Sequence, residues 1–254
     1  MSSTWTSDAL LELFVEISES IRRALDGIDG IDDWRKPGER SGQYGLDLTA
    51  DDVALRLLDA AGLGVLSEES GLRRAEQGIV VVIDPVDGST NASRGIPWFA
   101  TSLCAVDADG PFVALVENQA NGTRYTAVRG QGAFRNGLAI TPSGATELRR
   151  SIVGLSGLPP RWLGWQQFRA LGAAALDLCA VADGTLDGYI DASPSAHGSW
   201  DYLGGLLVCR EAGAVVTDAL DRDLIVLEHD ARRTPVAAAT PELLAEMLAQ
   251  RRTF

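Results

Sequence analysis

The spacing of apolar positions predicts a chain of mixed helices and strands. From Ser7 to Leu25 apolar residues recur every three or four positions, which is typical of an amphipathic helix, and Ser7 and Asp8 are suited to cap it. The polar stretch from Gly27 to Gly45 favours a mobile loop. Further helices are expected over Asp51–Ala61, Trp165–Arg169, Gly172–Ala182, Tyr202–Ala212 and Pro241–Arg251.

Short apolar runs between turn residues predict the strands. Four runs between Phe99 and Arg135 are separated by Asp109-Gly110, Asn121-Gly122 and Arg129-Gly130, so an antiparallel meander is expected there. Other strands are expected at Gly64–Leu66, Ile79–Ile83, Ser151–Leu155, Gly188–Asp191, and near Val215 and Ile225.

The alternation of strands and helices predicts an α+β or mixed α/β fold. Because the pattern changes after Pro142, we expect two halves, residues 1–145 and 146–254, that form one compact unit.

Composition narrows the possible partners. The net charge of −13 would repel nucleic acid and anionic membranes. No apolar run is long enough to span a membrane, no signal peptide is evident, and the three cysteines form no CxxC pair, so we expect a cytoplasmic protein with reduced cysteines. Two histidines are too few for a His-rich zinc site, so any metal should be bound by oxygen ligands.

The most informative stretch is VVVIDPVDGSTN, residues 80–91. Asp84 follows an apolar strand, and Pro85 stiffens the turn that leads to Asp87. Two carboxylates and the Val86 carbonyl are hard oxygen donors that suit Mg²⁺ or Mn²⁺. Read alone, the stretch also fits an Asx turn in which Asp87 caps a helix.

Three other features follow predicted strand ends or open helices. Gly88, Ser89 and Thr90 begin a predicted helix whose free amides suit a phosphate group. Glu68 follows the strand at Gly64–Leu66, although a Glu-Glu pair is also common in solvated turns. Asp201 follows Trp200 at the start of an apolar helix, where a simple helix cap is the alternative.

Together, LSEESG (66–71), DPVDGSTN (84–91) and WDYLGG (200–205) resemble, in this order, motifs of the inositol monophosphatase family. That family belongs to a superfamily of Mg²⁺-dependent, lithium-sensitive phosphatases that includes fructose-1,6-bisphosphatases. GQGAFRNG (130–137) and residues 168–191 extend the resemblance, which reaches from the first helix to Val216. It implies a layered αβαβα sandwich in which the second half covers the substrate.

The resemblance also implies a metal centre with two to three Mg²⁺ ions, with Mn²⁺ as a possible substitute and Li⁺ as a possible inhibitor. The first ion would be held by Glu68, Asp84 and the Val86 carbonyl. The second would be held by Asp84, Asp87 and Asp201. A weaker third ion would sit on Glu68, mostly through water.

The same resemblance implies hydrolysis by in-line attack of a metal-activated water, with no phosphoenzyme. Glu68 and Ser89 would be catalytic, Ser89 by orienting the water, and the amides of Gly88, Ser89 and Thr90 would hold the phosphate. Ser89 needs an acidic partner upstream. Asp51 is the better match, and Asp47 and Asp52 remain open because the stretch DLTADD is shorter than the family pattern.

The resemblance identifies the substrate-binding residues less directly than the metal ligands. Asp191, Ala174 and His197 are the implied substrate-binding residues, but counting back from Asp201 would put Pro194 in the place of Asp191. The difference arises from an insertion at 192–199, whose role stays open; within it, His197 is alternatively a solvated loop residue. Candidates for the family lysine before Asp47 are Arg35, Lys36 and Arg40.

We therefore predict a phosphomonoesterase that acts on a small phosphorylated polyol or sugar, with inositol 1-phosphate as the default substrate and a homodimer as the assembly. Fructose 1,6-bisphosphate, histidinol phosphate and a 3′-phosphonucleotide are alternative substrates. A non-catalytic, metal-dependent binding or regulatory protein is a further alternative. A kinase is disfavoured because the sequence lacks a G-x-x-x-x-G-K-[ST] loop.

Overall fold

The structure, a computed structural model, describes residues 5–28, 34–36, 44–192 and 197–254. Most of the loop predicted between Gly27 and Gly45 lies outside these residues. Within the described part of the chain, no helix is both long enough and apolar enough to cross a membrane.

Most helices begin close to the positions that the sequence predicts, but the cap of the first helix and the start of the second differ. The first helix is capped by Thr6, whose hydroxyl accepts the Ala9 N–H at 3.2 Å, rather than by Ser7 or Asp8. The second helix begins at Gly45, six residues earlier than predicted, and so carries both Asp47 and Asp51. The helices are α1 (Ser7–Asp26), α3 (Gly45–Ala60), α4 (Ser89–Arg94), α5 (Ala174–Ala182), α6 (Ser199–Ala212) and α7 (Pro241–Arg251), with a 3₁₀ turn at Leu148–Arg150.

The first sheet has eight strands in the order β2-β1-β3-β4-β5-β6-β7-β8. The predicted antiparallel meander is confirmed over β4 to β7. Among the described strands of this sheet, β1 and β3 are the one parallel pair, so their carboxyl ends lie at the same edge. The strands are β1 (Gly64–Ser67), β2 (Gly71–Arg73), β3 (Val80–Asp87), β4 (Ala100–Asp107), β5 (Gly110–Asn118), β6 (Arg124–Val128), β7 (Gly132–Arg135) and β8 (Leu138–Ala139).

The second sheet has five strands in the order β10-β9-β11-β13-β12. Its central strand β11 pairs parallel with β9 and antiparallel with β13. The strands are β9 (Ile152–Ser156), β10 (Gln167–Arg169), β11 (Gly188–Asp191), β12 (Val215–Asp218) and β13 (Pro235–Ala238).

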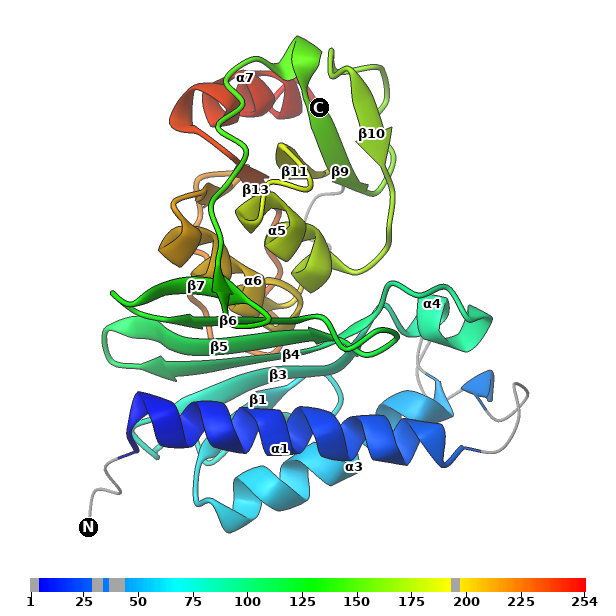
Figure 1. The fold of residues 1–254 in the computed structure, drawn as a ribbon, viewed down its shortest axis with the longest axis vertical. Helices are drawn as coiled ribbons and strands as arrows, with labels where there is room; N and C mark the ends of the chain where they lie inside the picture. The colour runs from blue at the N-terminus through cyan, green and yellow to red at the C-terminus, as the bar shows by residue number, and fades with distance from the viewer. Residues whose placement is uncertain (1–4, 29–33, 37–43, 193–196) are drawn as a thin grey trace.

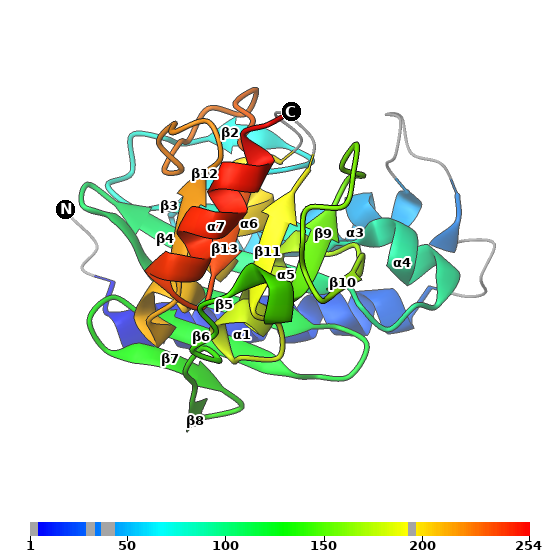
Figure 2. The same cartoon turned by 90° about the horizontal axis from the view of Figure 1, so that it is seen from above.

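These elements stack in five layers, which confirms the predicted αβαβα sandwich (Figure 1). Helices α1 and α3 cover one face of the first sheet, α5 and α6 lie between the two sheets, and α7 crosses the outer face of the second sheet (Figure 2). The division into units 1–145 and 146–254 stays a prediction, because α6 packs on strands of both sheets.

Two predicted elements of the second half are wrong. Residues 165–169 do not form a helix: Trp165 is buried, and Gln167–Arg169 are exposed and form β10, because a five-residue run is too short to bury a helical face. The strand expected near Ile225 is instead the fully buried run Pro235–Ala238, which lies between β11 and β12.

Two glycines of α6 let this helix pack closely against the first sheet and against α5. A Cβ atom on Gly204 would lie 2.6 Å from the Ser102 hydroxyl on β4, and one on Gly205 would lie 2.6 Å from Leu178 on α5. The Gly-Gly step of the WDYLGG motif therefore lets α6 approach the first sheet. This approach brings the first turn of α6 to the carboxyl ends of β1 and β3.

Candidate metal centre

The parallel register of β1 and β3 brings the first two carboxylates together. Ser67 pairs with Ile83, so Glu68 and Asp84 are the next residues on adjacent strands. The Glu68 N–H still bonds the Ile83 carbonyl at 3.3 Å, which holds the two strand ends side by side. The predicted strand end at Ile83 is too early, because β3 continues to Asp87.

A bulge in β3 shapes the turn that contains Asp84. The pairing with β4 shifts between Asp84 and Asp87, so Pro85 and Val86 bulge from the ladder. The Val86 N–H donates to Asp84 Oδ1 at 2.9 Å, and the Thr101 hydroxyl donates to the Pro85 carbonyl at 2.8 Å. Asp84 therefore makes the Asx-type contact, and the cap of α4 is Gly88 rather than Asp87.

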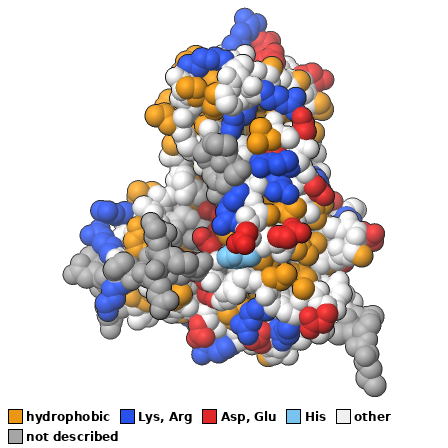
Figure 3. Space-filling view, turned by 180° about the vertical axis from the view of Figure 1, so that it is seen from behind, with side chains coloured by type: hydrophobic (Ala, Val, Ile, Leu, Met, Phe, Trp, Pro, Cys, Tyr) orange, Lys and Arg blue, Asp and Glu red, His pale blue; other side chains and the backbone are white. Residues whose placement is uncertain are grey.

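The third carboxylate comes from the second half of the chain. Asp201 lies in the first turn of α6, where its Oδ2 accepts the Gly198 N–H at 2.8 Å. One carboxylate oxygen from each of Glu68, Asp84 and Asp201 lies within 4.8 Å of the others. Figure 3 shows one face of the molecule on which acidic side chains gather around a histidine.

Burial and mutual repulsion make this cluster electrostatically unfavourable without a cation. Burial, with Asp201 as the next cause, raises the pKa of Glu68 to about 9. Asp84 is only 2% exposed, and burial together with the Glu68 charge raises its pKa well above the usual range. Three oxygen donors at this spacing fit a hard divalent cation, which would neutralise their charge.

We expect the metal-free protein to lose stability as pH rises from about 5 to about 9. The pKa of Glu68 rises from 4.5 to about 9 on folding, and that of Asp47 rises from 3.8 to about 7. The folded state therefore binds these protons more tightly than the unfolded chain, and the stability they contribute disappears as pH rises through the folded-state values.

Thermal melting in EDTA should show this fall, and saturating Mg²⁺ should restore the melting temperature most at the alkaline end. The raised pKa of His197, about 9, acts in the same direction. A melting temperature in EDTA that is flat or rising over this range would contradict the electrostatic reading of the cluster.

Asp87 lies beside the cluster but faces α5. Its carboxylate accepts the Ala175 N–H at 2.7 Å and the Ala174 N–H at 3.3 Å. Burial and the Asp201 charge raise its pKa, while the bond from Ala175 opposes them. Ala174 thus meets the site through its backbone amide, and its substrate contact stays a prediction.

The acidic residues of α3 are placed differently from one another. Asp51 is buried, and its carboxylate accepts the hydroxyls of Ser67 and Ser70. Asp52 is exposed and pairs with Arg56. Asp47, one turn before Asp51, is the acidic residue that lies close to Ser89.

Asp47 keeps one carboxylate oxygen available. Its Oδ2 accepts the Tyr44 N–H at 2.7 Å, whereas its buried Oδ1 has no hydrogen-bond partner among the described residues. Burial raises the pKa of Asp47 to about 7, while the Tyr44 amide and the nearby Ser89 hydroxyl lower it. The geometry therefore favours Asp47 over Asp51 as the partner of Ser89.

Gly88 fits the first turn of α4 tightly against the second half. Its φ of +85° lies in the left-handed region, and a Cβ there would lie 3.0 Å from the Gly172 carbonyl. The phosphate role of Gly88, Ser89 and Thr90 stays a prediction. Among the lysine candidates, Arg35 donates to the Ser93 carbonyl at 3.0 Å, the Lys36 carbonyl accepts from Gly45, and Arg40 lies outside the described residues.

His197 is not the solvated loop residue that the sequence allowed. Its side chain is only 12% exposed, and its Nδ1 lies 3.2 Å from Asp201 Oδ2. Asp191, at the end of β11, is fully buried, with Oδ2 4.0 Å from His197 Nε2. Pro194, the alternative to Asp191, lies outside the described residues, and the substrate roles of Asp191 and His197 stay predictions.

Sequence reasoning missed two residues that support the site. His229 Nε2 lies 3.0 Å from the Glu68 carbonyl, and its ring lies 4.9 Å from that of Trp200. Asn91 donates to the carbonyls of Trp98 and Leu171, both at 2.7 Å, and so joins α4 to the turn before α5. Asn91 is the last residue of the DPVDGSTN motif, so the sequence contained a signal for it. For His229 the sequence contained no signal other than the small number of histidines.

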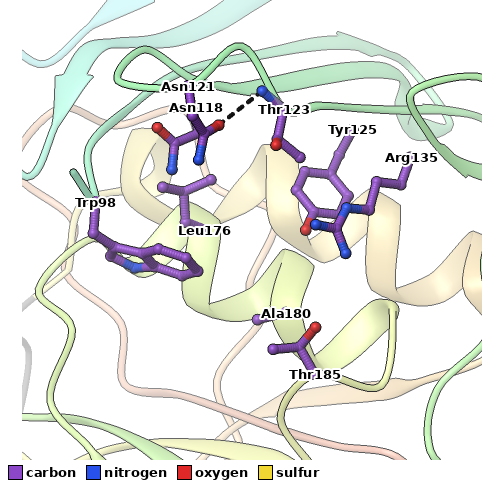
Figure 4. A pocket seen from close by; sticks show the side chains of 9 residues that line it. All are labelled: Trp98, Asn118, Asn121, Thr123, Tyr125, Arg135, Leu176, Ala180 and Thr185. Atoms are coloured by element: carbon purple, nitrogen blue, oxygen red, sulfur yellow. Dashed lines mark hydrogen bonds between the residues drawn. The ribbon is translucent and has the colours of Figure 1, made fainter.

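A separate cavity of about 80 Å³ has Trp98 in its lining. Trp98 lines it from the loop before β4, Tyr125 and Arg135 line it from the first sheet, and Leu176 and Ala180 line it from α5 (Figure 4). Three of its polar side chains already have protein partners: Trp98 Nε1 donates to Asp177, and Tyr125 and Arg135 both donate to Asp183. The cavity therefore offers little to a polar ligand.

Comparisons with known proteins place this geometry in a family. A family model described as the inositol monophosphatase family matches residues 57–254. A fructose-1,6-bisphosphatase/inositol-1-monophosphatase from Methanothermobacter thermautotrophicus is 32% identical over 90% of this chain and 91% of its own. An inositol-1-monophosphatase from Mesorhizobium japonicum is 36% identical over 72% of this chain and 73% of its own.

The fold leads to the same neighbours. A solved structure of a hypothetical protein from Pyrococcus horikoshii, with similarities to inositol-1-monophosphatase, superposes with a TM-score of 0.88. It is 25% identical and covers 96% of this chain and 99% of its own.

Proposed function

Because the chain belongs to the inositol monophosphatase family of phosphatases, we propose that it is a Mg²⁺-dependent phosphomonoesterase that hydrolyses a small phosphorylated polyol or sugar. The observation that carries the proposal is the carboxylate cluster of Glu68, Asp84 and Asp201, whose oxygens lie within 4.8 Å of one another. Its donors are all oxygen, as Mg²⁺ and Mn²⁺ prefer.

The proposed roles divide between holding cations and handling protons. Glu68, Asp84, Asp201 and the Val86 carbonyl would hold the cations, and Asp87 would contribute to the second site from its place against α5. Bound divalent cations would supply charge neutralisation of the phosphate and activation of water. The Ser89 hydroxyl would orient the attacking water. Asp47 Oδ1, which is buried and near Ser89, would accept the proton that the water releases through this hydroxyl.

Inositol 1-phosphate is the first proposed substrate, and fructose 1,6-bisphosphate is the second. The second is supported by relatives whose names include both activities, such as the Methanothermobacter protein. The end of β11, where Asp191 lies beside His197, would meet the hydroxyl-rich part of either substrate. A homodimer and a cytoplasmic location complete the proposal.

The test is phosphate release from a panel of monoesters with Mg²⁺, with Mn²⁺ and with EDTA. We expect Mg²⁺-dependent turnover that is highest on inositol 1-phosphate or fructose 1,6-bisphosphate, and lower on histidinol phosphate and a 3′-phosphonucleotide. Added Li⁺ should inhibit. Tight Mg²⁺ binding without turnover of any ester would instead support the non-catalytic binding protein.

A further inference from the structure

A buried hydrogen-bonded chain reaches Asp201 from the second sheet. Tyr189 on β11 is fully buried, and its hydroxyl lies 2.9 Å from His197 Nε2. The other ring nitrogen, Nδ1, lies 3.2 Å from Asp201 Oδ2. The chain therefore runs from Tyr189 through His197 to a carboxylate of the metal cluster.

The carboxylate fixes the direction of the bond between His197 and Asp201. An ionised carboxylate only accepts hydrogen bonds, so the Nδ1–H of His197 donates to Asp201. Nε2 then faces the Tyr189 hydroxyl at 2.9 Å, so the ring is held at both nitrogens. Removing that hydroxyl would leave Nε2 without this buried partner and would let the ring turn about its Cβ–Cγ bond, away from Asp201.

The backbone around His197 is fixed as well. His197 and Arg233 exchange two backbone hydrogen bonds, at 3.3 and 2.8 Å, in an isolated antiparallel bridge. A Cβ on Gly198 would lie 2.3 Å from the Trp200 ring, so the turn between His197 and Asp201 accepts only glycine. The Gly198 N–H donates to the same Asp201 oxygen at 2.8 Å.

We propose that Tyr189 and His197 are positioning residues that hold the Asp201 carboxylate in the orientation that binds the cation. Two donors on Oδ2 prevent the carboxylate from rotating about its Cβ–Cγ bond and define which lone pairs face Glu68 and Asp84. In this proposal His197 and Gly198, which belong to the insertion at 192–199, act by holding Asp201. The inference rests on the proposed function, because it needs Asp201 to be a metal ligand.

Tyr189→Phe is the decisive variant, and Tyr125→Phe is its matched control. Each change removes one hydroxyl from a buried tyrosine; that of Tyr125 donates to Asp183 at 2.8 Å, beyond the opposite end of α5. In calorimetric titrations of metal-free protein with Mg²⁺ and Mn²⁺, we expect Tyr189→Phe to weaken binding by roughly tenfold or more. Tyr125→Phe should bind as the wild type does.

Variants of His197 separate positioning from general packing. The side-chain amide of His197→Asn keeps an N–H near the place of Nδ1, so it should retain more cation affinity than His197→Ala. Melting temperatures in EDTA verify that each variant folds. The order of these melting temperatures should differ from the order of the cation affinities. If Tyr189→Phe does not fold, the comparison of His197→Asn with His197→Ala carries the test.

The outcomes distinguish this inference from the proposed function. If the wild type binds cations and hydrolyses esters, but Tyr189→Phe and His197→Ala bind cations equally well, the positioning role is wrong and the phosphatase stands. If the wild type binds neither Mg²⁺ nor Mn²⁺, both proposals are overturned.

Discussion

Asp84→Asn should lower phosphate release by roughly a thousandfold, since a bound cation contributes several kcal/mol to stabilising the transition state and each 1.36 kcal/mol is tenfold. A carboxylate oxygen of Asp84 lies within 4.8 Å of those of Glu68 and Asp201, and Asp84 is 2% exposed. Asparagine keeps the size of the side chain and an oxygen for the Val86 N–H, so the change removes a charge and little else.

The same variant should be at least as stable as the wild type when metal is removed. The raised pKa values of Glu68 and Asp84 mean that the folded cluster resists ionisation, so losing one charge relieves repulsion. Melting curves should therefore show an unchanged or higher melting temperature in EDTA and a much smaller gain on adding Mg²⁺.

Asp183→Asn is the control for Asp84→Asn. Asp183 is the C-cap residue of α5, with a buried side chain that accepts bonds from Tyr125 and Arg135 outside the cluster. We expect it to lose stability and to keep most of its turnover. A rate for Asp84→Asn within tenfold of the wild type would rule out Asp84 as a central ligand.

The cluster itself could be anticipated because its members sit at positions that topology brings together. Glu68 and Asp84 each follow an apolar run, and the ends of two parallel neighbouring strands must meet at one edge. Strand topology alone does not predict that Asp201 joins the cluster, because its distance from Glu68 and Asp84 depends on the packing of α6 through Gly204 and Gly205. Its inclusion came from resemblance to the family rather than from periodicity.

The errors arose where tertiary contacts override local pattern. Residues 165–169 have helix-compatible composition, yet Gln166 and Gln167 both donate to the Ser151 carbonyl and extend the sheet. His229 reaches Glu68 from a loop 161 residues later in the chain, and no local spacing encodes such a contact. The orientation of Asp87 toward α5 also depends on tertiary structure, because the amides of Ala174 and Ala175 hold its carboxylate; its role as a metal ligand stays a prediction.

The choice among the acidic residues of α3 is the clearest case of this limit. Asp47 and Asp51 lie four residues apart, so a helix presents both on nearly the same face. The resemblance to the family favoured Asp51, with Asp47 and Asp52 left open. The helix position favours Asp47 instead: Asp51 meets Ser67 and Ser70, and Asp47 comes close to Ser89.

Asp47→Asn should therefore reduce kcat by about a hundredfold or more, the usual loss when a general base is removed. An amide oxygen can still accept the Tyr44 N–H, so the start of α3 should survive, but an amide cannot take a proton from Ser89 or its water. KM should change little, because Asp47 is not expected to bind the alcohol. Steady-state kinetics at saturating Mg²⁺ measure both constants.

Asp51→Asn is the matched comparison, since it makes the same chemical change one helical turn away. Asp51 is also buried, and replacing one of its oxygens with an NH₂ group leaves either Ser67 or Ser70 without its acceptor, at a cost of about 1–3 kcal/mol. We expect a lower melting temperature with kcat close to the wild type. The reverse result, a large loss of kcat in Asp51→Asn and a small one in Asp47→Asn, would return the proton-accepting role to Asp51.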